Sequence, residues 1–216
     1  MKRTPFPPRT GHELEGWALM WARLAAVPGA TVDLDQAWET EITRLRERLG
    51  GINLSELPEV AAIRRLFREA GTDPTRYRPS SEALARRVLK GSLPPPIHPL
   101  VDFNNLLSVR LLLPCCVIEP GAVVPPFVLR RGCPGETMDS MRGPFSLEGK
   151  PVLEDRRGPF GTPVTDNERV RVTPATEEAW LVVYAPAGAA EGAGAVLGSM
   201  AREFPAVELL EGPAGD

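Results

Sequence analysis

Hydrophobic side chains recur at helical spacing through the first half of the chain. In the clearest case, one face of residues 34–49 carries Leu34, Trp38, Ile42, Leu45 and Leu49. Asp33 stands before this segment as an N-cap, and Gly50 follows it. The pattern therefore predicts a helix with one buried and one solvated face.

Three more helices are predicted after this one. The first follows Pro58 and ends at Gly71, and the second starts with Ser80 as its N-cap and runs to Gly91. The third follows Pro99 and carries leucines and a phenylalanine along one side.

Short apolar runs between glycines and prolines replace the helical pattern in the second half. They predict strands at residues 117–118, 123–130, 151–154, 169–172 and 179–185. A helix at 189–204, a strand at 207–210 and an early strand at 16–27 complete the set. The chain is thus expected to adopt an α+β fold, with helices from the first half packed on a mixed or antiparallel sheet from the second half.

Composition and charge place the chain among ordinary globular proteins. Its 216 residues are 43% hydrophobic and 25% charged, with a net charge of −3. A dedicated nucleic-acid binder usually has a basic excess, so any such role here depends on a local patch.

Cysteine, histidine and hydropathy patterns bear on location and cofactors. There is no run of about 18 apolar residues and no apolar segment behind the charged N-terminus. Cys115, Cys116 and Cys133 lack ligand or disulfide spacing, and His12 and His98 are far apart in sequence. We therefore expect a reduced, cytoplasmic protein without a cofactor, structural metal or membrane partner.

Two polar groupings are candidates for binding. Arg76, Arg78 and Ser80 stand at a helix start, where free N–H groups and arginines favour anions. The alternative is that the arginines form ion pairs that pin the loop. Asp102 and Asn105, with Ser108, form a polar stripe on the following helix, which either braces a loop or lines a pocket.

Several of these segments together resemble a known family. The block RYRPSSEALARRVLKG, then IHPLVDFNNLLSVR and DNERVRVT, is similar to the editing domain of the phenylalanyl-tRNA synthetase beta subunit, the B3/B4 domain. The resemblance spans residues 57–184. It implies one domain over residues 1–216, with 57–185 as the editing-like core, 1–56 adding a strand and helix, and 186–216 a helix and strand.

The resemblance also implies a function and a set of site residues. The synthetase domain hydrolyses tRNA mischarged with tyrosine, and a carboxylate in its pocket reads the phenolic hydroxyl. Glu168 falls at the position of that carboxylate, and Asn105 matches an asparagine of the pocket helix. Cys116 stands where the family has a histidine, and the glycine-rich loop before the glutamate is absent.

Catalytic and RNA-binding groups are assigned less directly. Cys116 is the one candidate for a catalytic group, but no histidine nearby would activate its thiol, so it is interpreted mainly as a small residue beside the pocket. Arg86, Arg87 and Lys90 could present a positive helix face to tRNA phosphates, although a solvated face is the common outcome.

Three hypotheses follow. The first is an aminoacyl-ester hydrolase acting in trans on mischarged tRNA, with Glu168 reading the side chain and Cys116 shaping the pocket floor. The second is a non-catalytic module that binds a free amino acid or small metabolite and has lost its tRNA partner, with Arg76 or Arg78 holding a carboxylate and Glu168 an amino or hydroxyl group. Ser80, Asp102 and Asn105 are the remaining candidates for substrate binding. The third is a purely structural interaction domain.

Overall fold

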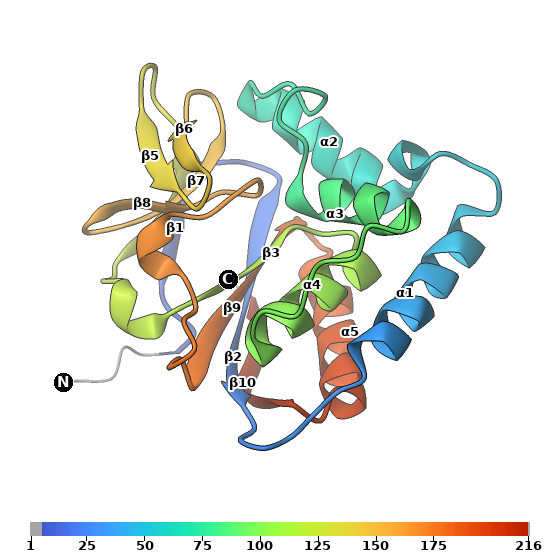
Figure 1. The fold of residues 1–216 in the computed structure, drawn as a ribbon. Coiled ribbons are helices and arrows are strands. Elements are labelled where there is room, and N and C mark those ends of the chain that lie inside the picture. The colour runs from blue at the N-terminus through green and yellow to red at the C-terminus, as the bar shows by residue number, and fades with distance from the viewer. Residues whose placement is uncertain (1–5, 216) are drawn as a thin grey trace.

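The computed structural model describes residues 6–215, in which five α-helices lie on one side of two packed β-sheets (Figure 1). The helices are α1 (Leu34–Leu49), α2 (Pro58–Ala70), α3 (Ser80–Leu89), α4 (Pro99–Leu111) and α5 (Ala190–Glu203). Three short 3-10 turns are η1 (Leu54–Glu56), η2 (Pro120–Ala122) and η3 (Glu168–Val170). The strands are β1 (Thr10–His12), β2 (Trp17–Ala26), β3 (Cys115–Ile118), β4 (Phe127–Arg131), β5 (Thr137–Ser140), β6 (Gly143–Ser146), β7 (Pro151–Asp155), β8 (Gly158–Gly161), β9 (Glu178–Pro186) and β10 (Val207–Gly215).

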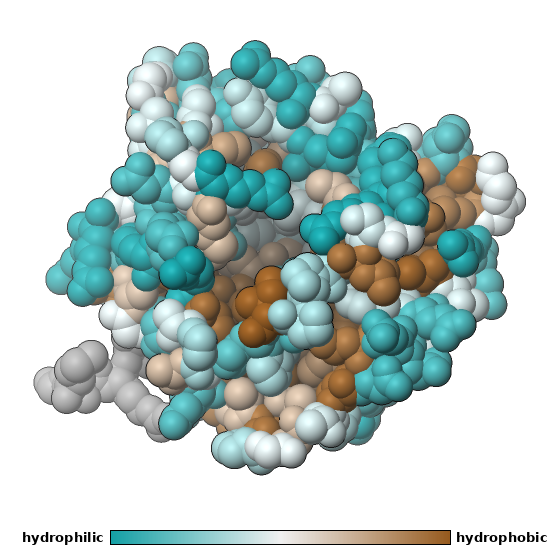
Figure 2. Space-filling view, viewed as in Figure 1, coloured by the Kyte–Doolittle hydropathy of each residue, from teal (hydrophilic) through white to brown (hydrophobic). Residues whose placement is uncertain are grey.

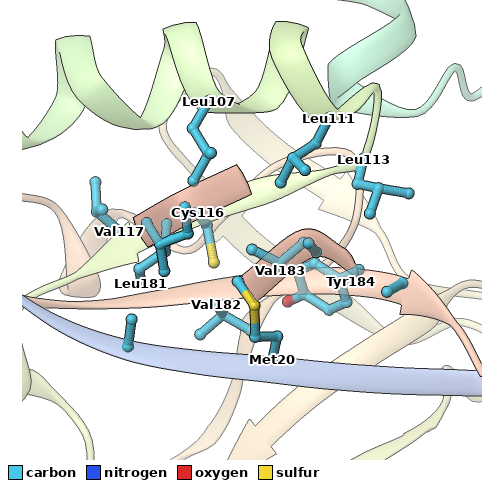
Figure 3. Close-up of a cluster of buried hydrophobic side chains, with 14 of the residues drawn as sticks. Met20, Leu107, Leu111, Leu113, Cys116, Val117, Leu181, Val182, Val183 and Tyr184 are labelled. Carbon is cyan, nitrogen blue, oxygen red and sulfur yellow. The ribbon is translucent and has the colours of Figure 1, made fainter. Parts of the chain in front are cut away.

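The central sheet is antiparallel, in the order β10-β2-β9-β3. Because successive side chains of a strand point to opposite faces, each strand of this sheet contributes side chains to two packed interfaces. Leu181 and Val183 of β9 lie on the face covered by α4, where Leu107 and Leu111 meet them (Figure 3).

The other face of the central sheet packs on a second, mixed sheet in the order β1-β4-β7-β8. Aromatic rings form this contact. Phe127 of β4 stacks on Trp21 at 5.6 Å between ring centroids, and it meets Trp180 at 5.9 Å and Phe160 at 5.5 Å. The β5–β6 hairpin projects beyond this sheet, and the layers run helix, sheet, sheet.

The α+β prediction is confirmed, and the helix ends agree closely with the sequence. The side chain of Asp33 accepts a hydrogen bond from the Gln36 N–H at 3.0 Å, as an N-cap does. Gly50 and Gly71 end α1 and α2 with positive φ values of 51° and 96°, a conformation that favours glycine.

Two local predictions are wrong. Residues 169–172, predicted as a strand, lie at the η3 turn, because the Asn167 side chain caps it by accepting the Arg169 N–H at 3.0 Å. Ser80 is not an N-cap but the first residue of α3. Its N–H donates to the Pro163 carbonyl at 2.9 Å, which ties α3 to the segment after β8.

The central sheet also contains strands from outside the segment in which the sheet was expected. The central sheet takes β2 from the first half and β10 from the C-terminal segment, so helices and strands are less segregated than the sequence pattern indicated. Within residues 6–215, no helix combines the length and apolar character that crossing a bilayer would need.

A buried carboxylate fixes α3 against its neighbours. The side chain of Glu82 is 1% exposed and accepts hydrogen bonds from Arg64 at 3.0 Å and Arg86 at 2.9 Å. The Arg78 guanidinium lies 3.6 Å from the same carboxylate. An ionised group this deeply buried is tolerated because several cations compensate it.

We predict that Glu82→Gln lowers the free energy of unfolding by about 3–5 kcal/mol, because it leaves partly buried arginines without their counter-ion. Urea denaturation measures this change. The matched control is Glu69→Gln, which breaks an exposed pair with Arg65 and should change stability by less than about 1 kcal/mol. Equal effects of the two variants would contradict the role assigned to Glu82.

Candidate functional site

Strands β3 and β9 lie side by side and bring Cys116 and Tyr184 to the same face of the central sheet. Cys116 is the register partner of Val182, and Tyr184 is two residues further along β9, so all three side chains share a face. Figure 3 shows the Cys116 sulfur directed away from α4, with the Tyr184 hydroxyl on the side of its ring nearer to the cysteine. Both side chains therefore lie between the two sheets.

Asp166 reaches the same place from the turn that follows β8. Gly161 and Asp166 are bridged across the turn, which the Thr162 hydroxyl organises by accepting the Val164 N–H at 3.1 Å and the Thr165 N–H at 3.0 Å. The residue is partly exposed as a whole, yet its carboxyl oxygen Oδ1 is buried beside the Cys116 side chain. We call Cys116, Asp166 and Tyr184 the buried polar cluster.

Gly161 allows this convergence. A Cβ atom at position 161 would lie 2.8 Å from the Tyr184 hydroxyl and 3.2 Å from Asp166 Oδ1. Two polar groups from different elements thus meet above the bare Cα of a glycine. A side chain of any size would have to displace one of them.

The buried polar cluster is incompletely satisfied. Neither Asp166 Oδ1 nor the Tyr184 hydroxyl has a well-formed hydrogen bond within the described part of the chain. An unpaired buried polar group typically costs about 1–3 kcal/mol, so native proteins rarely keep two together without a reason. The arrangement is suited to a ligand or water that supplies the missing partners.

Burial dominates the electrostatics of the cluster. It raises the pKa of Asp166 to about 7, against the opposing influence of the Cys116 side chain and the Thr162 backbone N–H. The pKa of Cys116 is also raised, first by burial and then by the negative charge of Asp166. Burial, followed by the charges of Cys116 and Asp166, raises the pKa of Tyr184, so the thiol and the phenol are neutral at physiological pH.

Figure 2 shows that this face of the molecule is hollowed near its centre, between the β5–β8 region and the helices. In the same view, β3 and the start of α3 lie at the edges of that region (Figure 1). The hydrogen bond from Ser80 to Pro163 links the α3 start to the turn that carries Asp166. The cluster therefore lies beneath the junction of helical and β layers.

The polar stripe on α4 braces its own ends. Asp102 is buried and accepts the Ile97 N–H at 3.1 Å, which closes the loop ahead of α4, and burial raises its pKa. The Ser108 hydroxyl donates to the Leu113 carbonyl at 2.9 Å. Asn105 is half-buried on the same helix. A direct role of Asp102 and Asn105 in binding stays a prediction.

The arginines singled out from the sequence are mostly occupied. Arg78 and Arg86 face Glu82, and Arg87 donates to the Ser92 and Leu93 carbonyls at 3.1 Å and 3.0 Å, capping the end of α3. Arg76 is exposed, and Lys90 is exposed at the C-cap of α3. Binding of RNA by Arg86, Arg87 and Lys90 stays a prediction.

Glu168 lies outside the buried polar cluster. Its side chain is 44% exposed and pairs with Arg171 at 2.8 Å on η3. The neighbouring Arg169 points inward, where it binds Asp155 at 2.7 Å. Of the residues proposed from the sequence, the structure brings Cys116 into the cluster, with Ser80 attached to the turn beside it.

Sequence reasoning missed Asp166 and Tyr184. Asp166 begins the DNERVRV segment that supports the family resemblance, yet attention went to Glu168, two residues later. The alternation of β9 would have placed Tyr184 with Trp180 and Val182 on one face. What no pattern indicated is that Cys116 lies on the same face of the adjacent strand.

Within the described residues, no group of three histidine, cysteine, aspartate or glutamate side chains is arranged to hold a metal ion. The site is accordingly defined by neutral and acidic polar groups in an α+β domain of two packed sheets with helices on one side.

Comparison with known families agrees with this architecture. The family model of the B3/4 domain matches residues 62–193, well over half of the chain, so the protein belongs to the B3/4 domain family. The match includes α3, α4, β3, the turn with Asp166 and all of β9. The resemblance to the synthetase editing domain is thereby confirmed at the level of the family.

A solved structure is also similar to this chain. It is an N-terminal fragment of the phenylalanyl-tRNA synthetase beta subunit from Pyrococcus horikoshii, with 13% identity and a TM-score of 0.46. The alignment covers 93% of this chain and 50% of the fragment, so the chain spans about half the length of that relative. No protein of curated function matches the sequence.

We predict a pH-dependent stability that Asp166→Asn removes. Since the folded pKa of Asp166, about 7, lies above its usual value, folding binds a proton and is favoured at low pH. This contribution is complete below about pH 4 and is lost as pH rises through 7, by about 4 kcal/mol at most. Urea denaturation between pH 5 and 8 tests it. Parallel pH profiles for wild type and variant would contradict the buried carboxyl.

We also predict that Gly161→Ala lowers stability by about 1–3 kcal/mol, because its methyl group collides with the Tyr184 hydroxyl. Tyr184→Phe removes that hydroxyl and should be neutral or stabilising by itself. The double variant should then regain part of the loss, which thermal denaturation of all four proteins measures. Strict additivity would mean that the two residues do not meet.

Proposed function

We propose that this protein hydrolyses the ester of aminoacyl-tRNA in trans, with the buried polar cluster as the centre that receives the aminoacyl group. The observation that carries the proposal is the pair of unpartnered oxygens, Asp166 Oδ1 and the Tyr184 hydroxyl, beneath the α3–turn junction. Membership of the B3/4 family supports the choice of substrate, since the related synthetase domain edits mischarged tRNA.

Asp166 is assigned the role of general base. A pKa of about 7 lets a carboxylate accept a proton at neutral pH more readily than an ordinary aspartate. Water attacks the ester carbonyl carbon and passes a proton to Asp166. Asp166 then returns this proton to the terminal ribose oxygen as the bond between that oxygen and the carbonyl carbon breaks, so the products are the ribose hydroxyl and the free amino acid.

Tyr184 and Cys116 act as neutral groups in this scheme. The Tyr184 hydroxyl remains a donor at physiological pH, and it can hydrogen-bond to the oxygen on which charge develops. Burial and the adjacent carboxylate disfavour the thiolate of Cys116, so water is a better nucleophile here than sulfur. Cys116 shapes the wall of the site.

A second function is favoured by one specific feature. A carboxylate with a free oxygen beside a free hydroxyl can bind an ammonium or hydroxyl group without any reaction. The site would then serve a non-catalytic module for a free amino acid or small metabolite.

The test uses purified protein and tRNAs charged with each radiolabelled amino acid, with release of the amino acid as the readout. We expect hydrolysis of at least one aminoacyl-tRNA, and Asp166→Asn should lower its rate by about 10²–10³-fold and abolish the pH limb near 7. Glu47→Gln, an exposed carboxylate on α1, is the control and should keep full activity.

Other outcomes separate the hypotheses. Loss of activity in Glu168→Gln but not in Asp166→Asn would place the functional carboxylate at Glu168 and not at Asp166. No hydrolysis of any charged tRNA, with saturable amino-acid binding in calorimetry, would favour the binding module. Neither activity nor binding would leave the interaction domain.

A further inference from the structure

A group of cations without counter-ions lies where α2 ends against the β5–β6 hairpin. Lys150 is 2% exposed, and its ammonium donates one hydrogen bond, to the Glu148 carbonyl at 3.2 Å. It lies 3.7 Å from the centroid of the Tyr77 ring, and the Phe145 ring is 5.4 Å away. Within residues 6–215 it forms no ion pair with a carboxylate; the charge of Glu148 acts on it from a distance, and the aromatic rings contact it directly.

Arg131 and Arg76 stand beside this buried cation. The Gly132 N–H, next to Arg131, donates to the Lys150 carbonyl at 2.8 Å, which makes the two segments neighbours. The Arg131 guanidinium lies directly over Gly71, leaving no room for a Cβ atom there. The Arg76 guanidinium is 5.2 Å from the centroid of the same Tyr77 ring that Lys150 contacts.

Two side-chain contacts hold these parts in place. The Thr72 hydroxyl donates to the Gly149 carbonyl at 2.7 Å, and the edge of Tyr77 meets Phe145 at a ring distance of 6.0 Å. The segments that carry the cations are therefore fixed relative to one another by these contacts. We define Arg76, Arg131 and Lys150 as the cationic patch.

Charge balance distinguishes the cationic patch from the arginine next to it in β4. Arg130, adjacent in sequence, is paired with Glu136 and Glu154. By contrast, Arg76 and Arg131 are both exposed and form no ion pair among the described residues. Burial, followed by the charge of Arg76, lowers the pKa of Lys150, and the charge of Glu148 opposes them only in part.

We propose that the cationic patch binds the phosphate backbone of RNA, with the two exposed arginines contacting phosphates and the buried lysine strengthening the positive field. Arginine matches phosphate through paired N–H donors. The ring of Tyr77 is already engaged by cations and by Phe145, so the surface suits phosphates and not stacked bases. Figure 2 shows hydrophilic side chains over the upper part of this face, where α2 and the hairpin lie.

The proposal rests on the proposed function for its choice of RNA, and it names the surface that holds the tRNA. This surface differs from the α3 face predicted from the sequence. There Arg86 is committed to Glu82 and Arg87 to backbone carbonyls. Arg76 of the cationic patch is the first residue of the RYRPSSEAL block, which leads into α3, so RNA bound at the patch lies on the same segment as the α3–turn junction.

The experiment measures binding of uncharged tRNA to the full chain as a function of KCl concentration. The slope of log K against log salt should lose about one unit with Arg76→Gln and again with Arg131→Gln. The double variant should bind roughly tenfold or more weakly at 0.1 M salt. Arg46→Gln and Arg202→Gln remove exposed arginines elsewhere and should leave the slope unchanged.

Each alternative has its own result. An unchanged slope in the double variant, or a change in Lys90→Gln instead, would overturn the cationic patch. So would tighter binding of polyglutamate than of tRNA, which would indicate an acidic protein partner. Because uncharged tRNA carries no ester, patch-dependent binding without deacylation would leave this proposal standing and defeat the hydrolase. Deacylation with patch-independent binding would do the reverse.

Discussion

Strand β9 is buried on both faces, and the rest of the structure is arranged around that constraint. Its backbone pairs with β2 on one side and β3 on the other, so its hydrogen bonds are satisfied within the sheet. Its alternating side chains then require two covering layers. Leu181 and Val183 are covered by helices, and Trp180, Val182 and Tyr184 by the second sheet.

Because this face of β9 is buried, the polar groups of the candidate site lower the stability of the fold. Between the two sheets, aromatic rings pack together at one end. At the other end, the phenol of Tyr184, the thiol of Cys116 and the carboxyl of Asp166 come together, where Gly161 leaves room for them. Replacing these groups by apolar residues of similar shape would serve stability better. Their presence at one point of the interface is the physical reason for treating it as a functional site.

Three buried carboxylates take up several of the arginines of this protein. Glu82 gathers three arginines, Asp155 holds Arg169, and a further carboxylate, Glu41, is buried against Arg110. An arginine count along the sequence therefore overstates the positive surface. Other exposed arginines such as Arg46 and Arg202 also form no ion pair among the described residues, but Arg76, Arg131 and Lys150 are grouped at the hairpin, which favours the cationic patch over the paired arginines of α3 as the RNA contact.

Local rules acting within a few residues were enough to predict much of this protein. Asp33 as a cap, Pro58 at a helix start and Gly71 at a helix end each follow from backbone geometry that neighbouring residues decide. The α+β class and the family resemblance were likewise readable from patterns and motifs. The site was not, because Cys116, Asp166 and Tyr184 come from two strands and a turn whose contact depends on register and sheet packing. Glu168, two residues from Asp166, faces solvent because Arg169 is drawn inward by Asp155, a pairing between segments that only the tertiary structure brings together.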